Sequence, residues 1–363
     1  MLTFLHGADF HLDSPFRSLP PEQAAQRRQE QRDLWEDLAQ LVVQEKVDLV
    51  LLPGDLLDRN RVYPETVEAL REILGQLPAK VFISPGNHDP YTLRSTYARL
   101  AWPENVHIFS TADPQRVEVP ELDCAVYGSA FLTPYRLNSP LEGLEVSGEG
   151  LQIGCFHGEL DAAGRYGPLT REEIAASKLD YLALGHVHTA SGLKRAGQTY
   201  YAYPGCALGR GFDETGEKGV YLGRMDKGRV ELTFTPLQTR QYRVAPVDIT
   251  GRPPAMAVTE EVQNLSEKDI VRIVLTGLGD RNDPPQLEAL TKWAREKFFW
   301  AVVADETGLE PRVWNRRKED TLTGLFLRNM RIRLENAPEE EKAVLEKAVR
   351  FGLAALEGRE EPR

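Results

Sequence analysis

Residues 49–58, Leu-Val-Leu-Leu-Pro-Gly-Asp-Leu-Leu-Asp, place a short apolar run directly before a turn that carries a carboxylate. The uninterrupted run before Pro53-Gly54 predicts a buried strand, and Asp55 follows its carboxyl end. Polar residues follow apolar runs at four further places: Asp9-Phe10-His11, Gly86-Asn87-His88-Asp89, His157-Gly158 and Gly185-His186-Val187-His188. These five motifs hold five of the seven histidines of the chain.

The segments between the first motifs alternate between strand and helix patterns. Apolar residues recur at helical spacing in 21–45 and 64–77, and the strand-like runs are 1–8, 49–52 and 80–83. This alternation predicts a parallel sheet, in which ligands bind just past the carboxyl ends of the strands. Further short runs at 106–127, 151–156 and 181–184, followed by antiparallel strand patterns at 198–203, 219–225 and 229–235, predict a second sheet packed on the first. The expected fold class is therefore α/β, with two packed β-sheets flanked by helices in four layers.

The pattern changes near residue 240 and again near residue 311, which predicts three domains. Residues 1–240 hold all five motifs, and residues 241–311 predict a small α/β domain. Residues 312–363 predict a helical tail, in which Leu322, Leu325, Phe326 and Met330 recur at helical spacing. Such a stripe fits either the core of the domain itself or a surface that docks a partner.

Composition limits the compartment and the partners. Hydrophobic residues make up 41% of the 363 residues, and no apolar run approaches the roughly 20 residues that cross a bilayer. No membrane association is therefore expected. The three cysteines, Cys124, Cys155 and Cys206, lack CxxC spacing, which predicts a reducing, cytoplasmic location. The net charge of −11 argues against a free-standing DNA-binding protein, because Lys and Arg supply most non-specific affinity for DNA.

The donor atoms of the motifs predict a site for two divalent metal ions. Asp9 and His11 lie two residues apart, so that in an extended segment their side chains share one face. Asp55 can reach two ions at once. Carboxylate plus imidazole suits manganese, and iron or zinc as alternatives, better than calcium or magnesium. The predicted ligands are Asp9, His11, Asp55, Asn87, His157, His186 and His188.

The charges of these ligands leave the site net positive, so that it can attract a phosphodiester, which a hydroxide bridging the two ions would attack in line. His88 need not be a ligand: with Asp89 adjacent it predicts a His–carboxylate pair that protonates the leaving oxygen. Each motif alone is more often a turn or a strand, but all five in this order favour one catalytic site. His6 and His107 are expected to be structural.

The five motifs resemble those of the calcineurin-like metallophosphoesterases. Within that superfamily the chain resembles the SbcD-type nucleases, and most of all a YhaO-like branch, of which the segment 8–16 and Tyr203-Pro204-Gly205 are typical. Several SbcD-type nucleases carry a histidine where this chain has Asp58, which matches the general GDxxD pattern. The resemblance implies one metal on Asp9, His11, Asp55 and His188, a second on Asp55, Asn87, His157 and His186, and His88 as the catalytic histidine.

The resemblance also implies a function for the later domains. Residues 241–311 would form a capping domain that seats DNA, and residues 312–363 would dock on an SMC-type ATPase of the SbcC/YhaN kind. The leading hypothesis is a manganese-dependent DNA nuclease subunit acting in DNA repair. The alternatives are a phosphodiesterase or phosphatase for small molecules and a non-catalytic regulatory subunit.

Basic residues fit either phosphate contacts or a solvated surface. They are Arg59, Arg61, Arg94 and Arg99 near the motifs, and Arg312, Arg316, Arg317 and Lys318 before the tail. The sequence leaves open exonuclease against endonuclease action and whether the chain forms a homodimer.

Overall fold

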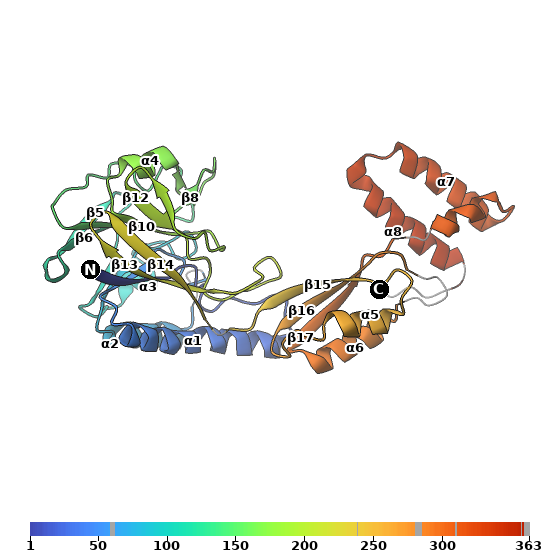
Figure 1. Cartoon of the computed structure of the whole chain (residues 1–363), viewed down its shortest axis with the longest axis horizontal. Coiled ribbons are helices and arrows are strands. Elements are labelled where there is room, and N and C mark those ends of the chain that lie inside the picture. The colour runs from blue at the N-terminus through green and yellow to red at the C-terminus, as the bar shows by residue number, and fades with distance from the viewer. Residues whose placement is uncertain (59–61, 238, 280–284, 309–310, 357, 359–363) are drawn as a thin grey trace. The chain divides into compact units, whose positions relative to one another are not determined.

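The computed structural model describes residues 1–58, 62–237, 239–279, 285–308, 311–356 and 358. Arg59 and Arg61, two of the basic residues named above, lie outside the described residues. The chain divides into two compact units, Met1–Gln241 and Tyr242–Arg363, and many of their elements are labelled in Figure 1. The predicted boundary at residue 311 falls inside the second unit, so the division into three domains stays a prediction.

Six strands form the first sheet of Met1–Gln241: Leu2–His6 (β1), Leu49–Leu52 (β2), Lys80–Ile83 (β3), Val106–Ile108 (β4), Gly219–Asp226 (β13) and Arg229–Pro236 (β14). Their spatial order is β14-β13-β1-β2-β3-β4. The pairs from β1 to β4 are parallel, and β13 is antiparallel to both of its neighbours. The crossover helices are Pro21–Gln44 (α1) and Pro64–Gln76 (α2). Both begin at proline, whose missing N–H is not needed at a first helical position.

The second sheet also has six strands: Gln115–Val119 (β5), Cys124–Gly128 (β6), Leu151–His157 (β7), Tyr181–Gly185 (β10), Lys194–Ala196 (β11) and Thr199–Ala202 (β12). Their order is β11-β12-β10-β7-β6-β5. The four central strands, β12, β10, β7 and β6, are parallel, and the edge strands β11 and β5 are antiparallel to their neighbours. Shorter elements of this unit are Thr96–Arg99 (α3), Pro120–Leu122 (η1), Glu159–Leu160 (β8), Pro168–Leu169 (β9) and Arg171–Ala176 (α4).

The main core lies between the two sheets. Side chains of the first sheet, such as Phe4 and Phe82, join side chains of the second, such as Ile153 and Tyr181, in one buried cluster. The other face of the first sheet packs on α1 and α2, and the other face of the second sheet packs beneath α4 and its flanking loops. Burial on both faces explains why β2 and β10 are uninterrupted apolar runs. The predicted fold of two packed sheets flanked by helices is confirmed (Figure 1). The strands β13 and β14, however, join the first sheet and not the second sheet in which they were expected.

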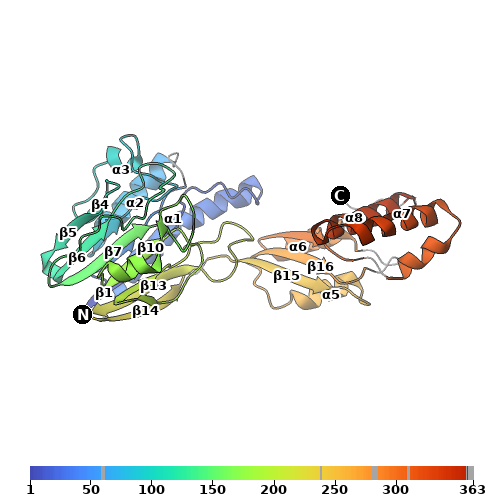
Figure 2. The ribbon, with the colours of Figure 1, turned by 90° about the horizontal axis from the view of Figure 1, so that it is seen from above.

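The unit Tyr242–Arg363 contains a parallel three-stranded sheet and two sets of helices. The strands are Tyr242–Asp248 (β15), Ile270–Thr276 (β16) and Trp300–Asp305 (β17), and β16 is central. Pro254–Glu261 (α5) and Leu287–Lys297 (α6) share a buried core with the sheet, beside which they lie in Figures 1 and 2. Pro311–Lys318 (η2), Leu322–Asn336 (α7) and Glu339–Leu356 (α8) form the helical tail around a separate core.

The apolar stripe of α7 lies partly in the core of the tail and partly on its surface. Met330 is buried and Phe326 is packed against the core of the tail. Leu322 and Leu325 are instead 67% and 49% exposed. The core alternative therefore applies to Met330 and Phe326, whereas Leu322 and Leu325 lie on the surface.

A partly buried ion pair connects α8 to the end of β17. Arg350 donates from Nη2 to Asp305 Oδ2 at 2.6 Å and from Nη1 to Asp305 Oδ1 at 3.0 Å. The Asp305 side chain is 6% exposed, and Thr307 donates to it as well. Burial alone would raise the pKa of Asp305, but the hydrogen bonds from Arg350 and Thr307 outweigh burial and hold the pKa below its usual range.

We expect Arg350→Met to lower the free energy of unfolding of Tyr242–Arg363 by about 1–3 kcal/mol at pH 7, because a buried carboxylate loses its charged partner. The depressed pKa of Asp305 means that its stabilisation is complete above the unfolded-state pKa near ~4 and is lost as pH falls through the folded-state pKa. Variant and wild type should therefore converge in acid. Urea unfolding at pH 7 and pH 3, followed by hydrogen exchange of α8, measures the difference. Lys347→Met, an exposed change on the same helix, is the control, and an equal loss in both variants would contradict the prediction.

Candidate metal centre

The five motifs converge at the carboxyl ends of β1, β2, β3, β7 and β10. Asp55 Oδ2 lies 3.8 Å from His11 Nε2 and 3.6 Å from His157 Nε2. His188 Nε2 lies 3.9 Å from Asp9 Oδ1 and 3.3 Å from His11 Nε2. Residues up to 177 positions apart in the sequence thus form one cluster because the two sheets pack with these strand ends together.

Left-handed backbone at the strand ends aims these side chains into the cluster. Asp9, His11 and Asp55 have φ of 53°, 47° and 53°. The expectation that Asp9 and His11 lie on an extended segment was therefore wrong, although both side chains do reach the same site. Such conformations are costly for residues other than glycine and concentrate at functional sites, where surrounding contacts hold them. Here His11 N donates to Asp55 O at 2.9 Å, which links the two turns.

Two glycines are required by the close packing of the cluster. A Cβ on Gly54, which has a φ of 89°, would lie 2.5 Å from His157 Nδ1. A Cβ on Gly86 would lie 2.2 Å from Asp55 Oδ1. Glycine therefore precedes Asp55 and Asn87 because there is no room for a side chain beside the donor atoms.

The donor atoms fall into groups that suit metal coordination. Asn87 Oδ1 lies 2.8 Å from His157 Nε2 and 3.1 Å from His186 Nδ1, so the amide oxygen belongs with these two rings. Three groups have potential ligand atoms within 4.8 Å of one another: Asp9, His11 and His188; Asp55, His157 and His186; and His11, Asp58 and His88. All seven predicted ligands thus lie in or beside the first two groups.

The electrostatics of the cluster fit divalent cations. Burial, and then repulsion from Asp55, raise the pKa of Asp9, and burial raises that of Asp55. Burial also lowers the pKa of His157 and of His186 to about 4, so both rings are neutral and present lone pairs. His11 Nδ1 is buried with no hydrogen-bond partner among the described residues. Buried carboxylates beside neutral imidazoles form a donor set that a cation stabilises.

His88 is paired with Asp58 rather than with Asp89. Its Nδ1 lies 3.1 Å from Asp58 Oδ1, and this hydrogen bond raises the pKa of His88. The side chain is 36% exposed at the edge of the cluster. A half-exposed ring whose protonated form is favoured is able to deliver a proton to a bound molecule.

Asp89 anchors the two central turns. Its carboxylate accepts hydrogen bonds from the backbone N–H groups of Asp55, Leu56, Leu57 and Gly86, and from the Tyr97 hydroxyl. The carboxylate is thus fully occupied and 2% exposed. The predicted His88–Asp89 pair is therefore wrong. The two residues are adjacent in sequence, but their side chains bind different partners.

Sequence reasoning missed two residues of the site, Arg210 and Glu214. Glu214 Oε1 lies 2.7 Å from His188 Nδ1, and Arg210 Nη2 donates to the same oxygen at 2.8 Å. Burial alone would raise the pKa of Glu214, but the hydrogen bonds from His188 and Arg210 hold it well below its usual range. The available signal was weak, because Gly211-Phe212-Asp213-Glu214 reads as an exposed turn.

The remaining histidines behave as expected. His6 is in the core, where its Nδ1 lies 2.9 Å from the Tyr181 hydroxyl and its Nε2 lies 3.1 Å from Leu184 O. Burial lowers the pKa of His6 to about 3. His107 lies on β4 beside Phe82 and Phe109, outside the cluster.

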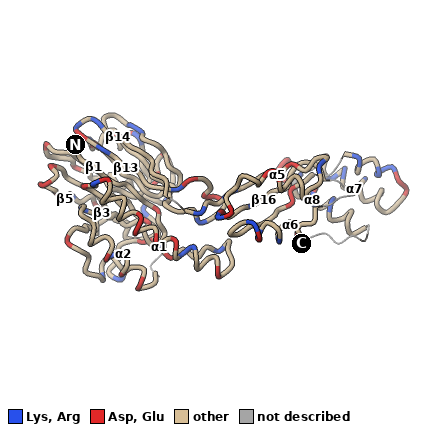
Figure 3. Tube along the Cα trace, turned by 60° about the horizontal axis from the view of Figure 1, so that its bottom comes forward, with Lys and Arg blue, Asp and Glu red and all other residues tan. Residues whose placement is uncertain are grey.

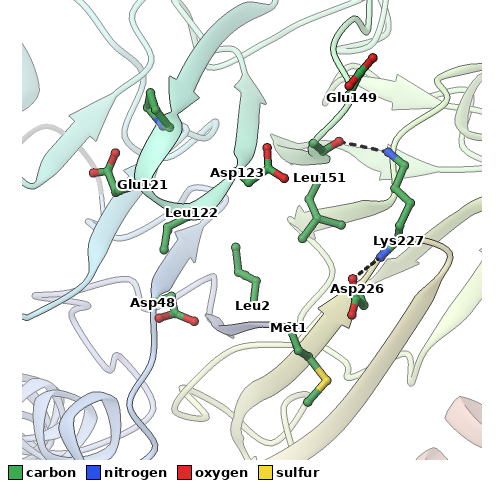
Figure 4. Close-up of a pocket in the computed structure, with 12 residues that line it drawn as sticks. Met1, Leu2, Asp48, Glu121, Leu122, Asp123, Glu149, Leu151, Asp226 and Lys227 are labelled. Carbon is green, nitrogen blue, oxygen red and sulfur yellow. Dashed lines mark hydrogen bonds between the residues drawn. The ribbon is translucent and has the colours of Figure 1, made fainter.

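A pocket lies at the opposite ends of the strands from the cluster (Figure 4). It is open, measures about 480 Å³ and is lined by the start of β1 and β7 and by the β13–β14 turn. Carboxylates predominate among its polar side chains, and Lys227 contacts Gly150 O and Asp180. It contains none of the five motifs.

Comparison with known proteins relates the chain to phosphoesterases. A family model described as calcineurin-like phosphoesterase matches residues 2–190. The chain is 30% identical over 339 residues to the metallophosphoesterase YhaO of Bacillus subtilis (strain 168), covering 88% of this chain and 81% of that protein. It is 24% identical over 261 residues to the SbcD subunit of the nuclease SbcCD of the same organism, covering 59% of this chain and 64% of that protein.

The corresponding SbcCD subunit of Rhodobacter capsulatus is 25% identical over 210 residues, covering 54% of this chain and 50% of that protein. Within the described part of the chain, no helix has the length and apolar character needed to cross a membrane.

We expect Asp89→Asn to lower the free energy of unfolding by about 1–3 kcal/mol, because an amide places an NH₂ group against backbone N–H donors. Tyr97→Phe removes one of the five donors and leaves the carboxylate, so it should cost about 1 kcal/mol. Urea unfolding of both variants measures this order. An Asp89→Asn protein with unchanged stability but no hydrolysis would assign Asp89 to the chemistry instead.

Proposed function

Because the chain belongs to the calcineurin-like phosphoesterase family, whose members use divalent metal ions to hydrolyse phosphoesters, we propose that it cleaves phosphodiester bonds of DNA as a nuclease subunit. The observation that carries the hydrolytic part is the geometry at Asp55. This buried carboxylate lies between His11, of the group with Asp9 and His188, and His157, of the group with His186. The half-exposed His88 lies beside His11.

The ligand assignment follows the two groups. The first ion would be held by Asp9, His11, Asp55 and His188, and the second by Asp55, Asn87, His157 and His186. Mixed carboxylate and imidazole donors favour manganese, with iron or zinc as alternatives. When bound, the two ions supply an activated water and positive charge that stabilises the transition state at phosphorus.

The side chains around the ions supply orientation and a proton. His88, oriented by Asp58 at 3.1 Å, holds a proton for the leaving oxygen. Asp89 holds the turns of Asp55 and Gly86 through hydrogen bonds to backbone N–H groups, which fixes the ligands of both groups relative to one another. The catalytic role is thus assigned to His88, and Asp89 is assigned the role of positioning the two turns.

DNA is supported as the substrate by the relatives named as SbcCD nuclease subunits. The small α/β region that begins at β15 also fits the capping domain that the resemblance implies. A different observation favours a small-molecule phosphodiester. The net charge is −11, and Figure 3 shows basic and acidic residues interspersed along both units. A protein with a net negative charge has little bulk electrostatic affinity for duplex DNA. A phosphodiesterase or phosphatase for small molecules is therefore the second candidate.

The decisive assay compares linear and circular duplex DNA with a bis-nitrophenyl phosphodiester, all with Mn²⁺. We expect His88→Ala to lower kcat by about 10²–10⁴-fold while Mn²⁺ binding survives, because the leaving oxygen loses its acid. Asp55→Ala should lose both hydrolysis and ion binding. His107→Asn, which lies outside the cluster, is the matched histidine control. Diester turnover without DNA cleavage, with and without an SbcC/YhaN-type ATPase, would refute the nuclease and support the small-molecule enzyme.

We also propose that the exposed apolar side chains of the tail bind this ATPase. On α7, Leu322 is 67% exposed, Leu325 49% and Ile332 58%, although the same helix buries Leu327 and Met330. The charge pair Leu322→Glu/Leu325→Glu should abolish co-purification with the ATPase and leave diester hydrolysis unchanged, since neither side chain belongs to the tail core. Truncation after Glu310 should have the same effect. Retained association in the charged variant would place the docking surface elsewhere.

A further inference from the structure

The two nitrogens of the His188 ring face different chemical environments. Nε2 faces the cluster, 3.3 Å from His11 Nε2 and 3.9 Å from Asp9 Oδ1. Nδ1 faces away from it, 2.7 Å from Glu214 Oε1. A ligand ring held this way can present one nitrogen to an ion only if the proton stays on the other nitrogen.

The contacts of Glu214 decide where that proton lies. Arg210 donates to this carboxylate from its backbone N to Oε2 and from Nη2 to Oε1, each at 2.8 Å. An ionised carboxylate only accepts, so the short contact to His188 Nδ1 requires a proton on Nδ1. Arg210 Nη2 also lies 3.3 Å from His188 Nδ1. This longer contact arises because Nη2 and Nδ1 both bind Glu214 Oε1 and are therefore close together.

The loop that carries Glu214 is fixed at several points. Glu214 N donates to Gly211 O at 3.1 Å, and Cys206 N donates to His188 O at 3.3 Å. From α1, the fully buried Arg27 donates through Nη2 to Gly209 O at 3.0 Å. Glu214 itself is 7% exposed. The carboxylate is therefore held beside His188 by the fold before any ion binds.

His188 differs in this respect from the other predicted imidazole ligands. His157 Nδ1 contacts a neutral carbonyl, Pro53 O, at 2.9 Å. His11 Nδ1 has no hydrogen-bond partner among the described residues, and Asp58 Oδ1 lies 3.9 Å from it. Glu159 Oε2 lies 3.9 Å from His186 Nε2, which is also beyond hydrogen-bond distance. A carboxylate at hydrogen-bond distance makes an imidazole a stronger donor than a carbonyl does.

We propose that Glu214 is a positioning residue, which holds His188 as the Nδ1–H tautomer with the Nε2 lone pair directed toward the first ion, while Arg210 holds Glu214 in place. The proposal rests on the proposed function only in taking His188 as a ligand of that ion. It assigns to this acidic residue a role in ion affinity that its neighbours in the same loop do not share.

Two measurements test it, using the full chain. The first reads the His188 tautomer in the metal-free wild type by long-range ¹H–¹⁵N correlation, with the His188→Asn spectrum to assign the ring. The second titrates Mn²⁺ calorimetrically into wild type, Glu214→Gln and Glu217→Gln. Glu217 is exposed in the same loop, so its variant makes the same charge change without touching His188.

We expect the wild-type ring to be the Nδ1–H tautomer. Glu214→Gln should bind one Mn²⁺ about 10- to 100-fold more weakly and the other unchanged, whereas Glu217→Gln should match wild type. An Nε2–H tautomer in the wild type, or equal Mn²⁺ affinities in the two variants, would overturn the proposal. If Glu214→Gln does not fold, the tautomer in the wild-type spectrum still tests the proposal. Neither measurement involves hydrolysis, so an absence of diester turnover would refute the proposed function alone.

Discussion

The structure is organised around the burial of two carboxylates, Asp9 and Asp55, in one cluster. They are 0% and 1% exposed, and burial, followed by the charge of Asp55, raises the pKa of Asp9. Buried like charges are costly unless hydrogen bonds or cations compensate them. The backbone N–H groups of His186 and His88 donate to Asp9 and Asp55, and neutral imidazoles fill the remaining directions. The left-handed turns and the glycines beside them exist to hold this arrangement.

Much of the fold could be predicted because its signals are local. Uninterrupted apolar runs such as Leu49–Leu52 marked strands buried on both faces, and Pro21 and Pro64 marked the first residues of helices. The pairing of strands is less local. Nothing in Thr199–Ala202 distinguishes its parallel neighbour β10 from its antiparallel neighbour β11, so the antiparallel interpretation of that region was incomplete. Likewise, helical spacing marked the apolar stripe of α7 but not which residues lie on the surface.

The candidate site, like the fold, could be predicted only where its signals are local. The residues predicted as ligands could be brought together from sequence because each lies at the end of a strand or within a few residues of it. The residues that orient them could not, because they come from other segments. His88 was paired with its neighbour Asp89, whereas the structure pairs it with Asp58, 30 residues away. Glu214 reaches His188 across 26 residues through a loop held by Arg27 of α1. Orientation is a property of tertiary packing, which no local motif encodes.

The central claim is that one site holds two ions through the shared carboxylate of Asp55, and electron paramagnetic resonance of the Mn²⁺-loaded protein tests it most directly. Ions that share a ligand are exchange-coupled, whereas isolated ions give a simple six-line spectrum. The account predicts two Mn²⁺ per chain and a coupled spectrum in the wild type. A single Mn²⁺ per chain, or two ions with only the six-line spectrum of isolated Mn²⁺, would contradict it.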